Sequence, residues 1–336
     1  MTVTTSVLDR GRTQLDPAMQ AAVARLDPSS RLHVSYHLGW CDVDGNPTPT
    51  GGGKGIRPAL AMLSAEAVGA PERVGVPGAV AVELVHNFSL LHDDVLDGDL
   101  ERRHRPTVWA VWGMPTAILA GDALLALAHE IVLEADGPGS AAACHLLAQV
   151  TRELTRGQTQ DLAFEKRNDV TLDECLDMAG GKTGSLLAAA SSIGAILAGA
   201  DEARVAALNT FGAQFGLAFQ LVDDVLGIWG DPAVTGKSVY SDLSAKKKSL
   251  PVTWALSHSD SAAQVRRWLD GDGDSDQDTL HEIADLLDQA GARNWALDEA
   301  ARRMKLAEDA LRSVDLNPQA RADMIELATY VVERDS

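Results

Sequence analysis

Cysteine is scarce in this chain of 336 residues: Cys41, Cys144 and Cys175 are odd in number and match no CxxC or Cys/His metal spacing. Scattered cysteines of this kind are typical of a reduced protein inside the cell rather than of a disulfide-linked secreted domain. A cytoplasmic location is therefore expected.

Aromatic residues make up only 4% of the chain, which favours a core built from Ala and Leu.

Basic residues are also in short supply. The chain has 29 Lys and Arg against 48 Asp and Glu, a net charge of −19. Nucleic acid and anionic lipid surfaces bind proteins that have an excess of positive charge, so neither is an expected partner. A small anionic substrate stays compatible, because a few basic residues can gather locally.

Long apolar runs and a secretory signal are missing as well. Residues 1–16 are polar and contain no apolar segment that a signal peptide would need. The longest uncharged stretches, 183–200 and 205–222, have 18 residues each and are rich in Ala, Gly and small polar residues. Since a transmembrane helix takes roughly 20 strongly apolar residues, the sequence predicts no membrane span.

Apolar residues recur instead every three to four positions, which predicts a succession of helices. The predicted helices cover residues 16–26, 59–68, 78–91, 116–134, 140–155, 171–178, 185–197, 202–226, 250–257, 279–314 and 318–332, and 40–53 is a loop rich in Gly and Pro. No alternating run of β-branched residues predicts a sheet. The expected fold class is all-α, with one helical domain over 16–336 after a loose N-terminus at 1–15.

An apolar helix ends in three aspartates. If the helix over 78–91 continues to Leu96, Asp93 and Asp97 lie on one face, with Asp94 beside them. Converging carboxylates repel one another unless a cation lies between them. Hard oxygen ligands suit Mg²⁺, which keeps several waters and bridges to substrate phosphates. The alternative is a solvated acidic helix end.

A second apolar helix ends in the same way further along the chain, where FQLVDDVL (219–226) contains Asp223 and Asp224. Two such helices that face each other across a cavity can hold metal ions between them, and these ions would bind and neutralise a diphosphate.

Basic residues lie beside these acidic motifs and in turns rich in glycine, where the backbone can approach an anion closely. None of these segments has the Walker A spacing GxxxxGK[ST], so the sequence predicts diphosphate binding without a P-loop. The basic residues concerned are Lys54, Arg57, Arg102, Arg103, Lys182, Lys237, Lys246, Lys247 and Lys248.

Taken in order, these motifs resemble those of the trans-prenyl diphosphate synthases, also called polyprenyl synthetases, and the linking text is similar to that of actinobacterial geranylgeranyl-type enzymes. The resemblance implies an isoprenoid-synthase helical bundle around a central cavity, and a homodimer. The motifs are GGKGIRP (52–58), HNFSLLHDDVLDGD (86–99), RRHRPT (102–107), GQTQDL (157–162), KTGSL (182–186), FQLVDDVLG (219–227), GKSVYSDL (236–243) and KKKSLP (246–251).

The resemblance also implies roles for individual residues. Asp93, Asp94 and Asp97 match the first aspartate motif and Asp223 and Asp224 the second, which together hold about three Mg²⁺ ions. Arg102, Lys182 and Lys247 match residues that bind the allylic diphosphate, and Thr183 and Gln220 match polar residues beside it. Lys54, Arg57, His86 and Arg103 match those that bind isopentenyl diphosphate, and Lys237 matches a lysine of the motif that closes the site.

The mechanism implied by the resemblance is ionisation of the allylic diphosphate, followed by attack of the isopentenyl double bond on the carbocation. The ions and the basic residues stabilise the charge that builds up on the leaving diphosphate, and loss of a proton gives the trans product. No protein nucleophile is needed.

Two departures from the family pattern stand out. Gly227 lies where the family usually has a third aspartate, so either Asp231 lends a carboxylate or the site uses Asp223 and Asp224 alone. The lysine cluster reads AKKKSLP, where a glycine more often precedes the lysine.

Product length depends on packing below Asp93. Phe88 lies five residues upstream, about 7.5 Å at 1.5 Å per residue, and Ser89 is a small residue four upstream. A bulky residue at position 89 would stop chain growth early, as in the farnesyl synthases of the family. The sequence therefore favours a twenty-carbon product first and a fifteen-carbon product second.

Two other functions are alternatives. A terpene cyclase of the same fold would have no use for Lys54, Arg57 and His86, because it binds no second diphosphate. A non-catalytic partner subunit would be expected to have a damaged first aspartate motif, whereas this one is complete.

Overall fold

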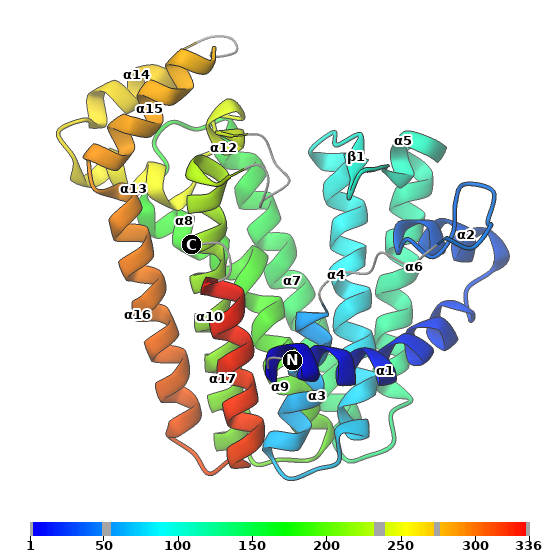
Figure 1. Cartoon of the computed structure of the whole chain (residues 1–336). Helices are drawn as coiled ribbons and strands as arrows, with labels where there is room; N and C mark the ends of the chain where they lie inside the picture. Colours follow the sequence, from blue (N-terminus) through cyan, green and yellow to red (C-terminus); the bar gives the residue numbers. More distant parts are fainter. Residues whose placement is uncertain (1–2, 49–54, 232–238, 272–275, 334–336) are drawn as a thin grey trace. The chain divides into compact units, whose positions relative to one another are not determined.

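The computed structural model describes residues 3–48, 55–231, 239–271 and 276–333. Within these ranges the chain is almost wholly helical (Figure 1). Its extended parts include a short antiparallel pair, β1 (Glu101–Arg102) with β2 (Arg105–Pro106), and an isolated bridge between Cys41 and Pro47. The all-α prediction is confirmed, because the apolar residues follow a helical period in nearly every element.

The chain divides into two compact units. Unit 1 comprises residues 1–151, 189–208 and 315–324, and unit 2 comprises 152–188, 209–314 and 325–336. Four helices have one end in each unit: α7 (Ser140–Glu165), α9 (Ser185–Leu197), α10 (Glu202–Trp229) and α17 (Pro318–Glu333). The single domain expected over 16–336 stays a prediction.

Unit 1 is organised around α4 (Val76–Leu96), which packs against α3 (Ile56–Ala67) and most extensively against α6 (Met114–Leu133). The other elements that lie wholly within this unit are α1 (Val3–Val23), α2 (Pro28–His37), the 3₁₀ turn η1 (Glu72–Gly75), the two strands and α5 (Val108–Trp112). Glycines bring these helices close together: a Cβ on Gly121 of α6 would lie 2.5 Å from the His92 ring.

Unit 2 has its own apolar core, formed where α13 (Leu250–His258), α14 (Ala262–Asp270), α15 (Gln277–Gln289) and α16 (Ala292–Arg312) meet. Val265, Leu287 and Ala292 are fully buried there. The unit also contains α8 (Leu172–Ala179), the π-helical turn η2 (Gly180–Gly184) and the short helix α12 (Ser241–Ser244).

The N-terminal segment differs from the prediction. We expected a helix to start at Pro17 after a loose segment, whereas α1 begins at Val3 and runs through Pro17. Arg10 forms an ion pair with Glu66 of α3 at 2.9 Å, and Val7 is 5% exposed, so contacts with α3 keep this segment ordered. After α1 ends at Val23, Asp27 caps α2 and Pro28 begins it.

The long helix predicted over 279–314 is also wrong, because it is divided into α15 and α16. Gly291 separates them with φ of +88°, a left-handed conformation that glycine adopts without strain. The apolar period continues across this break, which is why periodicity alone predicts one helix.

In the described part of the chain, three segments are long and apolar enough to cross a membrane by length and composition: Glu72–Leu96, Met114–Leu133 and Glu202–Trp229. In the structure 67% of the window in the first is buried inside the protein, and 50% in the third. Many of the apolar residues in these two segments are therefore buried against other helices of the protein. The window in α6 is 39% buried and keeps an exposed apolar face.

We predict that Gly194→Ala destabilises the protein by about 1–3 kcal/mol. A Cβ on Gly194 of α9 would lie 2.1 Å from the carbonyl oxygen of Ala61 in α3, which is backbone and cannot rotate away. Urea unfolding measures the change. Gly180→Ala is the control, since nothing lies within 4 Å of its Cβ; equal unfolding midpoints for the two variants would contradict the prediction.

Candidate active site

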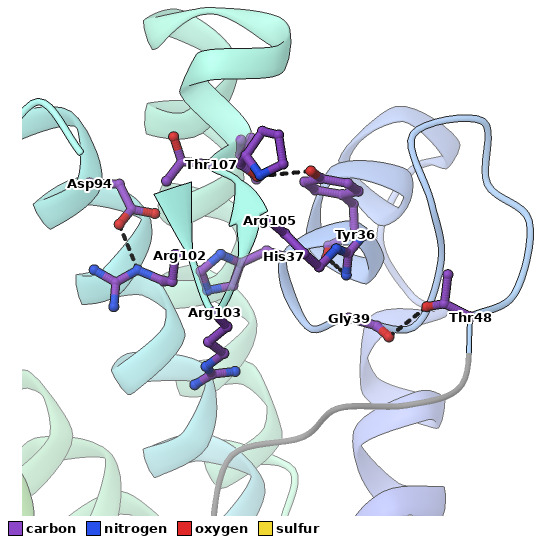
Figure 2. A pocket seen from close by; sticks show the side chains of 11 residues that line it. Tyr36, His37, Gly39, Thr48, Asp94, Arg102, Arg103, Arg105 and Thr107 are labelled. Atoms are coloured by element: carbon purple, nitrogen blue, oxygen red, sulfur yellow. Dashed lines mark hydrogen bonds and ion pairs between the residues drawn. The ribbon is translucent and has the colours of Figure 1, made fainter. Parts of the chain in front are cut away.

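The first acidic motif lies at the C-terminal end of α4. Asp94 is 1% exposed, and one of its oxygens accepts a hydrogen bond from Arg102 Nε at 2.6 Å (Figure 2). Its other oxygen, Oδ2, is buried without a hydrogen-bond partner. Burial raises the pKa of Asp94, and Arg102 partly opposes this shift. An unsatisfied buried carboxylate oxygen is suited to a cation.

Asp93 is partly buried and Asp97, which caps α4, is exposed. Among the described residues, no three carboxylate, imidazole or thiol side chains come close enough together to hold a metal ion on their own. The oxygen donors fit Mg²⁺, which would take its remaining ligands from water and from a substrate diphosphate.

A cavity of about 430 Å³ adjoins Asp94, between the end of α2 and the β1–β2 pair (Figure 2). Arg105 supports its wall: its guanidinium donates hydrogen bonds to the carbonyl oxygens of Tyr36 (3.1 Å) and Cys41 (2.7 Å). The residues that line the cavity are Tyr36, His37, Gly39, Thr48, Asp94, Arg102, Arg103, Arg105, Pro106, Thr107 and Val108.

Arg57 of α3 and His86 of α4 lie together in unit 1. Nε2 of His86 is 3.4 Å from an Arg57 nitrogen, and because the guanidinium can only donate, the imidazole accepts. Burial, together with the charge of Arg57, lowers the pKa of His86 well below its ordinary value. Arg57 Nε is buried without a partner. The predicted partner Lys54 lies outside the described residues.

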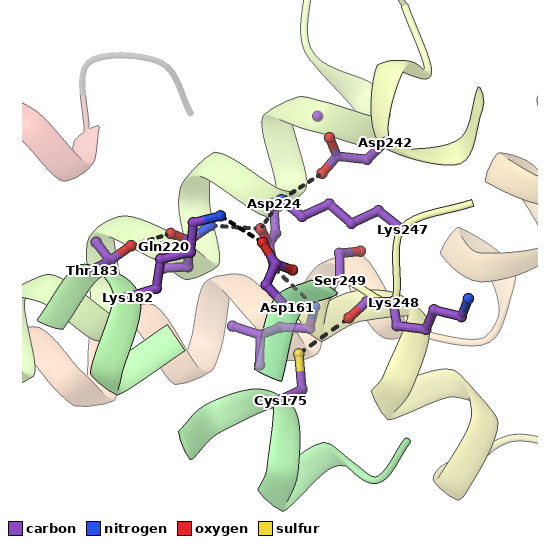
Figure 3. A network of polar contacts seen from close by, with 12 residues as sticks. Asp161, Cys175, Lys182, Thr183, Gln220, Asp224, Asp242, Lys247, Lys248 and Ser249 are labelled. Atoms are coloured by element: carbon purple, nitrogen blue, oxygen red, sulfur yellow. Dashed lines mark hydrogen bonds and ion pairs between the residues drawn. The ribbon is translucent and has the colours of Figure 1, made fainter. Parts of the chain in front are cut away.

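The second acidic motif lies near the end of α10 in unit 2 (Figure 3). Asp224 is 3% exposed and accepts hydrogen bonds from Gln220 Nε2 (2.8 Å) and the backbone N–H of Leu250 (2.9 Å). Thr183 donates to Gln220 Oε1 at 2.7 Å. Lys247 Nζ lies 3.9 Å from Asp224. Burial raises the pKa of Asp224 to about 6, against the opposing charge of Lys247.

Lys182 lies in the π-turn η2, where its Nζ is 2.5 Å from Asp161 Oδ2 (Figure 3). The turn lies against α7 at Gly157, where a Cβ would be 2.4 Å from the backbone nitrogen of Lys182. Asp161 was not predicted as a site residue, although it belongs to the quoted motif GQTQDL (157–162).

The structure thus groups the predicted residues within each unit. In unit 1, Asp94 contacts Arg102, and Arg57 contacts His86; in unit 2, Thr183, Gln220, Asp224 and Lys247 form one network, next to Lys182. Lys237 lies outside the described residues. That the two aspartate motifs face each other stays a prediction.

Comparison with known proteins identifies the family of this chain. The model of the family "Polyprenyl synthetase" matches residues 46–287. The chain is 49% identical to the (2E,6E)-farnesyl diphosphate synthase of Mycobacterium tuberculosis, over 99% of this chain and 94% of that protein. It is 41% identical to the geranylgeranyl diphosphate synthase of the same organism, over 98% and 94%.

Solved structures of polyprenyl synthetases are also similar to this chain. The polyprenyl synthetase of Streptomyces coelicolor A3(2) superposes with a TM-score of 0.94 at 50% identity, covering 98% of this chain and 99% of that one. A polyprenyl synthase from Caulobacter crescentus, with a TM-score of 0.80 and 30% identity over 98% of each chain, is complexed with calcium and isoprenyl diphosphate.

This chain therefore belongs to the polyprenyl synthetase family. It is a trans-prenyl diphosphate synthase, an alkyl transferase that condenses isopentenyl diphosphate with allylic diphosphates, in a family that uses divalent metal ions.

We predict that two histidines of unit 1, His37 and His86, lower the stability of the protein in acid. Burial, with Arg103 and Arg102 nearby, lowers the pKa of His37 to about 3, and the pKa of His86 is also lowered. The unfolded chain therefore binds more protons at these two histidines, so their contribution to stability is complete above about pH 6.5 and falls as the pH falls. For His37 the loss between pH 6.5 and 5 is at most about 2 kcal/mol.

Urea unfolding at pH 5 and pH 7 measures this loss. His37→Asn should reduce the difference between the two pH values, whereas the same substitution at the exposed His145 should leave it unchanged. An unchanged difference in the His37 variant would contradict the assignment.

Proposed function

We propose that the protein makes farnesyl diphosphate, the fifteen-carbon product, by adding isopentenyl diphosphate to dimethylallyl and geranyl diphosphate. The small residue Ser89 had favoured a twenty-carbon product first. The higher identity to a farnesyl synthase, 49% against 41% for a geranylgeranyl synthase, favours the alternative.

The packing around Phe88 is the structural observation that supports this product. Phe88 is 8% exposed, and its ring lies edge-on to the His92 ring, with the two ring centroids 4.7 Å apart. Both rings fill the space left by Gly121 of α6, where a Cβ would be 3.4 Å from Phe88. Ser89, although small, donates its hydroxyl to the carbonyl of His86 within its own helix. Phe88, five residues before Asp93, is therefore the residue that we propose to limit the product to fifteen carbons.

The roles of the site residues are part of the proposal. Asp93, Asp94, Asp97, Asp223 and Asp224 would hold magnesium ions, which neutralise the leaving diphosphate. Arg102, Lys182 and Lys247 bind the allylic diphosphate, with Thr183 and Gln220 beside it, and Lys237 belongs to the motif that closes the site. Lys54, Arg57, His86 and Arg103 bind isopentenyl diphosphate and orient its double bond.

The protonation states fit these roles. His86 is neutral at pH 7, because burial and Arg57 lower its pKa, so it adds no further charge beside a buried guanidinium. Its Nε2 accepts from Arg57, which leaves Nδ1–H as a donor for a diphosphate oxygen. No side chain needs to act as a nucleophile.

Two alternative functions would give different reaction products. A terpene cyclase would form a hydrocarbon from an allylic diphosphate alone, and the paired Arg57 and His86 argue against it. A non-catalytic subunit would show no turnover, and the complete first motif argues against that.

The exposed face of α6 supports a homodimer. Met114, Ile118, Leu119 and Leu133 are 51%, 38%, 66% and 56% exposed, and large apolar side chains on one surface helix are typical of an interface between subunits. We propose that a second copy covers this face and that the protein is cytoplasmic.

Product analysis with Mg²⁺, isopentenyl diphosphate and each of dimethylallyl, geranyl and farnesyl diphosphate tests the function. We expect farnesyl diphosphate from the first two primers and little conversion of the third. A twenty-carbon product from all three primers would restore the geranylgeranyl assignment. A hydrocarbon formed without isopentenyl diphosphate would mean a cyclase.

Phe88→Ala should lengthen the main product by at least one five-carbon unit, because it removes one of the two rings that fill the space beside Gly121. The truncation also costs about 3–5 kcal/mol of stability. Leu280→Ala, in the apolar core of unit 2, is the matched control and should keep the original product. If both variants keep it, Phe88 does not limit chain length.

A further inference from the structure

The two acidic motifs of this chain differ at one position. The first reads DDVLD (93–97) and the second DDVLG (223–227). In each motif the second aspartate is buried, Asp94 at 1% and Asp224 at 3% exposed, and pairs with a basic residue. The second motif has Gly227 in place of a carboxylate one turn after Asp223.

A carboxylate from another element lies against this glycine. A Cβ built on Gly227 would be 2.4 Å from Oδ2, 2.5 Å from Cγ and 2.8 Å from Oδ1 of Asp242. Asp242 therefore packs against bare backbone, in the space where a side chain at position 227 would begin. Glycine is the residue that leaves this space open.

The short helix α12 fixes Asp242 in place. Ser241 donates a hydrogen bond to the carbonyl of Gly227 at 3.3 Å, which ties the start of α12 to α10. Leu243 is fully buried in the core of unit 2. The hydroxyl of Tyr240 lies 2.9 Å from Nδ1 of His281 in α15. Because three residues next to Asp242 are anchored in this way, its carboxylate has little freedom to move.

Asp242 shares a cation with the second motif. Lys247 Nζ lies 3.9 Å from Asp242 Oδ2 and 3.9 Å from Asp224 Oδ1 (Figure 3). The backbone N–H of Lys247 also donates to the carbonyl of Asp242 at 2.9 Å. Asp224 already accepts hydrogen bonds from Gln220 and Leu250, so Asp242 is the second carboxylate that holds the ammonium group.

The charge of Lys247 depends on this surrounding. Burial alone would lower its pKa, but the negative charges of Asp224 and Asp242, and then of Asp161 and Asp223, raise it above the ordinary value. Lys247 is therefore a partly buried cation between two carboxylates.

We infer that Asp242 supplies, from α12, the carboxylate that position 227 lacks, and that it acts as a positioning residue that holds Lys247 toward the diphosphate. This inference rests on the proposed function, because Lys247 is there assigned to the allylic diphosphate. Asp242 takes this role instead of Asp231, the candidate from the sequence, which is exposed beyond the end of α10.

Moving the carboxylate between the two positions tests the inference. The variants are Asp242→Asn, Asp242→Ala, Gly227→Asp and the double variant Gly227→Asp/Asp242→Ala, with the exposed Asp260→Asn as control. Calorimetry measures the Kd of inorganic diphosphate in the presence of Mg²⁺, steady-state kinetics give kcat and KM, and urea unfolding reports that each variant is folded.

We expect Asp242→Asn and Asp242→Ala to weaken diphosphate binding about tenfold or more and to lower kcat, as substitutions next to a bound ion commonly do. Gly227→Asp alone should also bind weakly, because its side chain collides with Asp242. The double variant should recover most of the lost affinity, which a merely structural role of Asp242 would not produce.

The inference would be overturned if Asp242→Asn bound diphosphate as tightly as the unchanged protein. It would also be overturned if Asp231→Asn, and not Asp242→Asn, lost the affinity for diphosphate. A folded double variant as weak as Asp242→Ala would show that Asp242 does not stand in for a residue at 227. If the double variant does not fold, the isosteric Asn variant still decides. Absence of turnover in the unchanged protein would count against the proposed function, while the binding comparison would remain valid.

Discussion

A buried carboxylate at the end of an apolar helix is the constraint on which the site depends. Asp94 and Asp224 are both almost fully covered, and taking a charge out of water is costly unless a partner compensates it. Each has a basic partner from a later segment, Arg102 from β1 and Lys247 from the turn after α12. The segments that follow the two helices are thereby bound to the helix ends.

Glycines near the functional residues let charged groups come close to a neighbouring backbone. Gly157 lets the turn that contains Lys182 approach α7, and Gly227 leaves room for Asp242. In both cases a charged group reaches its place because a neighbouring backbone has no side chain. Lys182 is thus held beside Asp161, and Asp242 beside Lys247.

The helical period and the aspartate motifs were enough to predict the fold class and the position of the acidic residues at helix ends, and α9 begins and ends where the sequence predicted. Contacts between distant segments could not be predicted. Asp242 lies next to Gly227 only because α12 folds back onto α10, and no local pattern encodes that contact. The break at Gly291 was missed because the apolar period runs through it.

The π-turn at Gly180–Gly184 has a consequence for the length of this part of the chain. A π-turn contains one residue more than the α-helical turn it replaces, so it rotates everything that follows relative to α8. Loss of a single residue here would restore a regular helix and turn Lys182 and Thr183 away from Asp161 and Gln220. Between α8 and α9, insertions and deletions should therefore be tolerated less than substitutions.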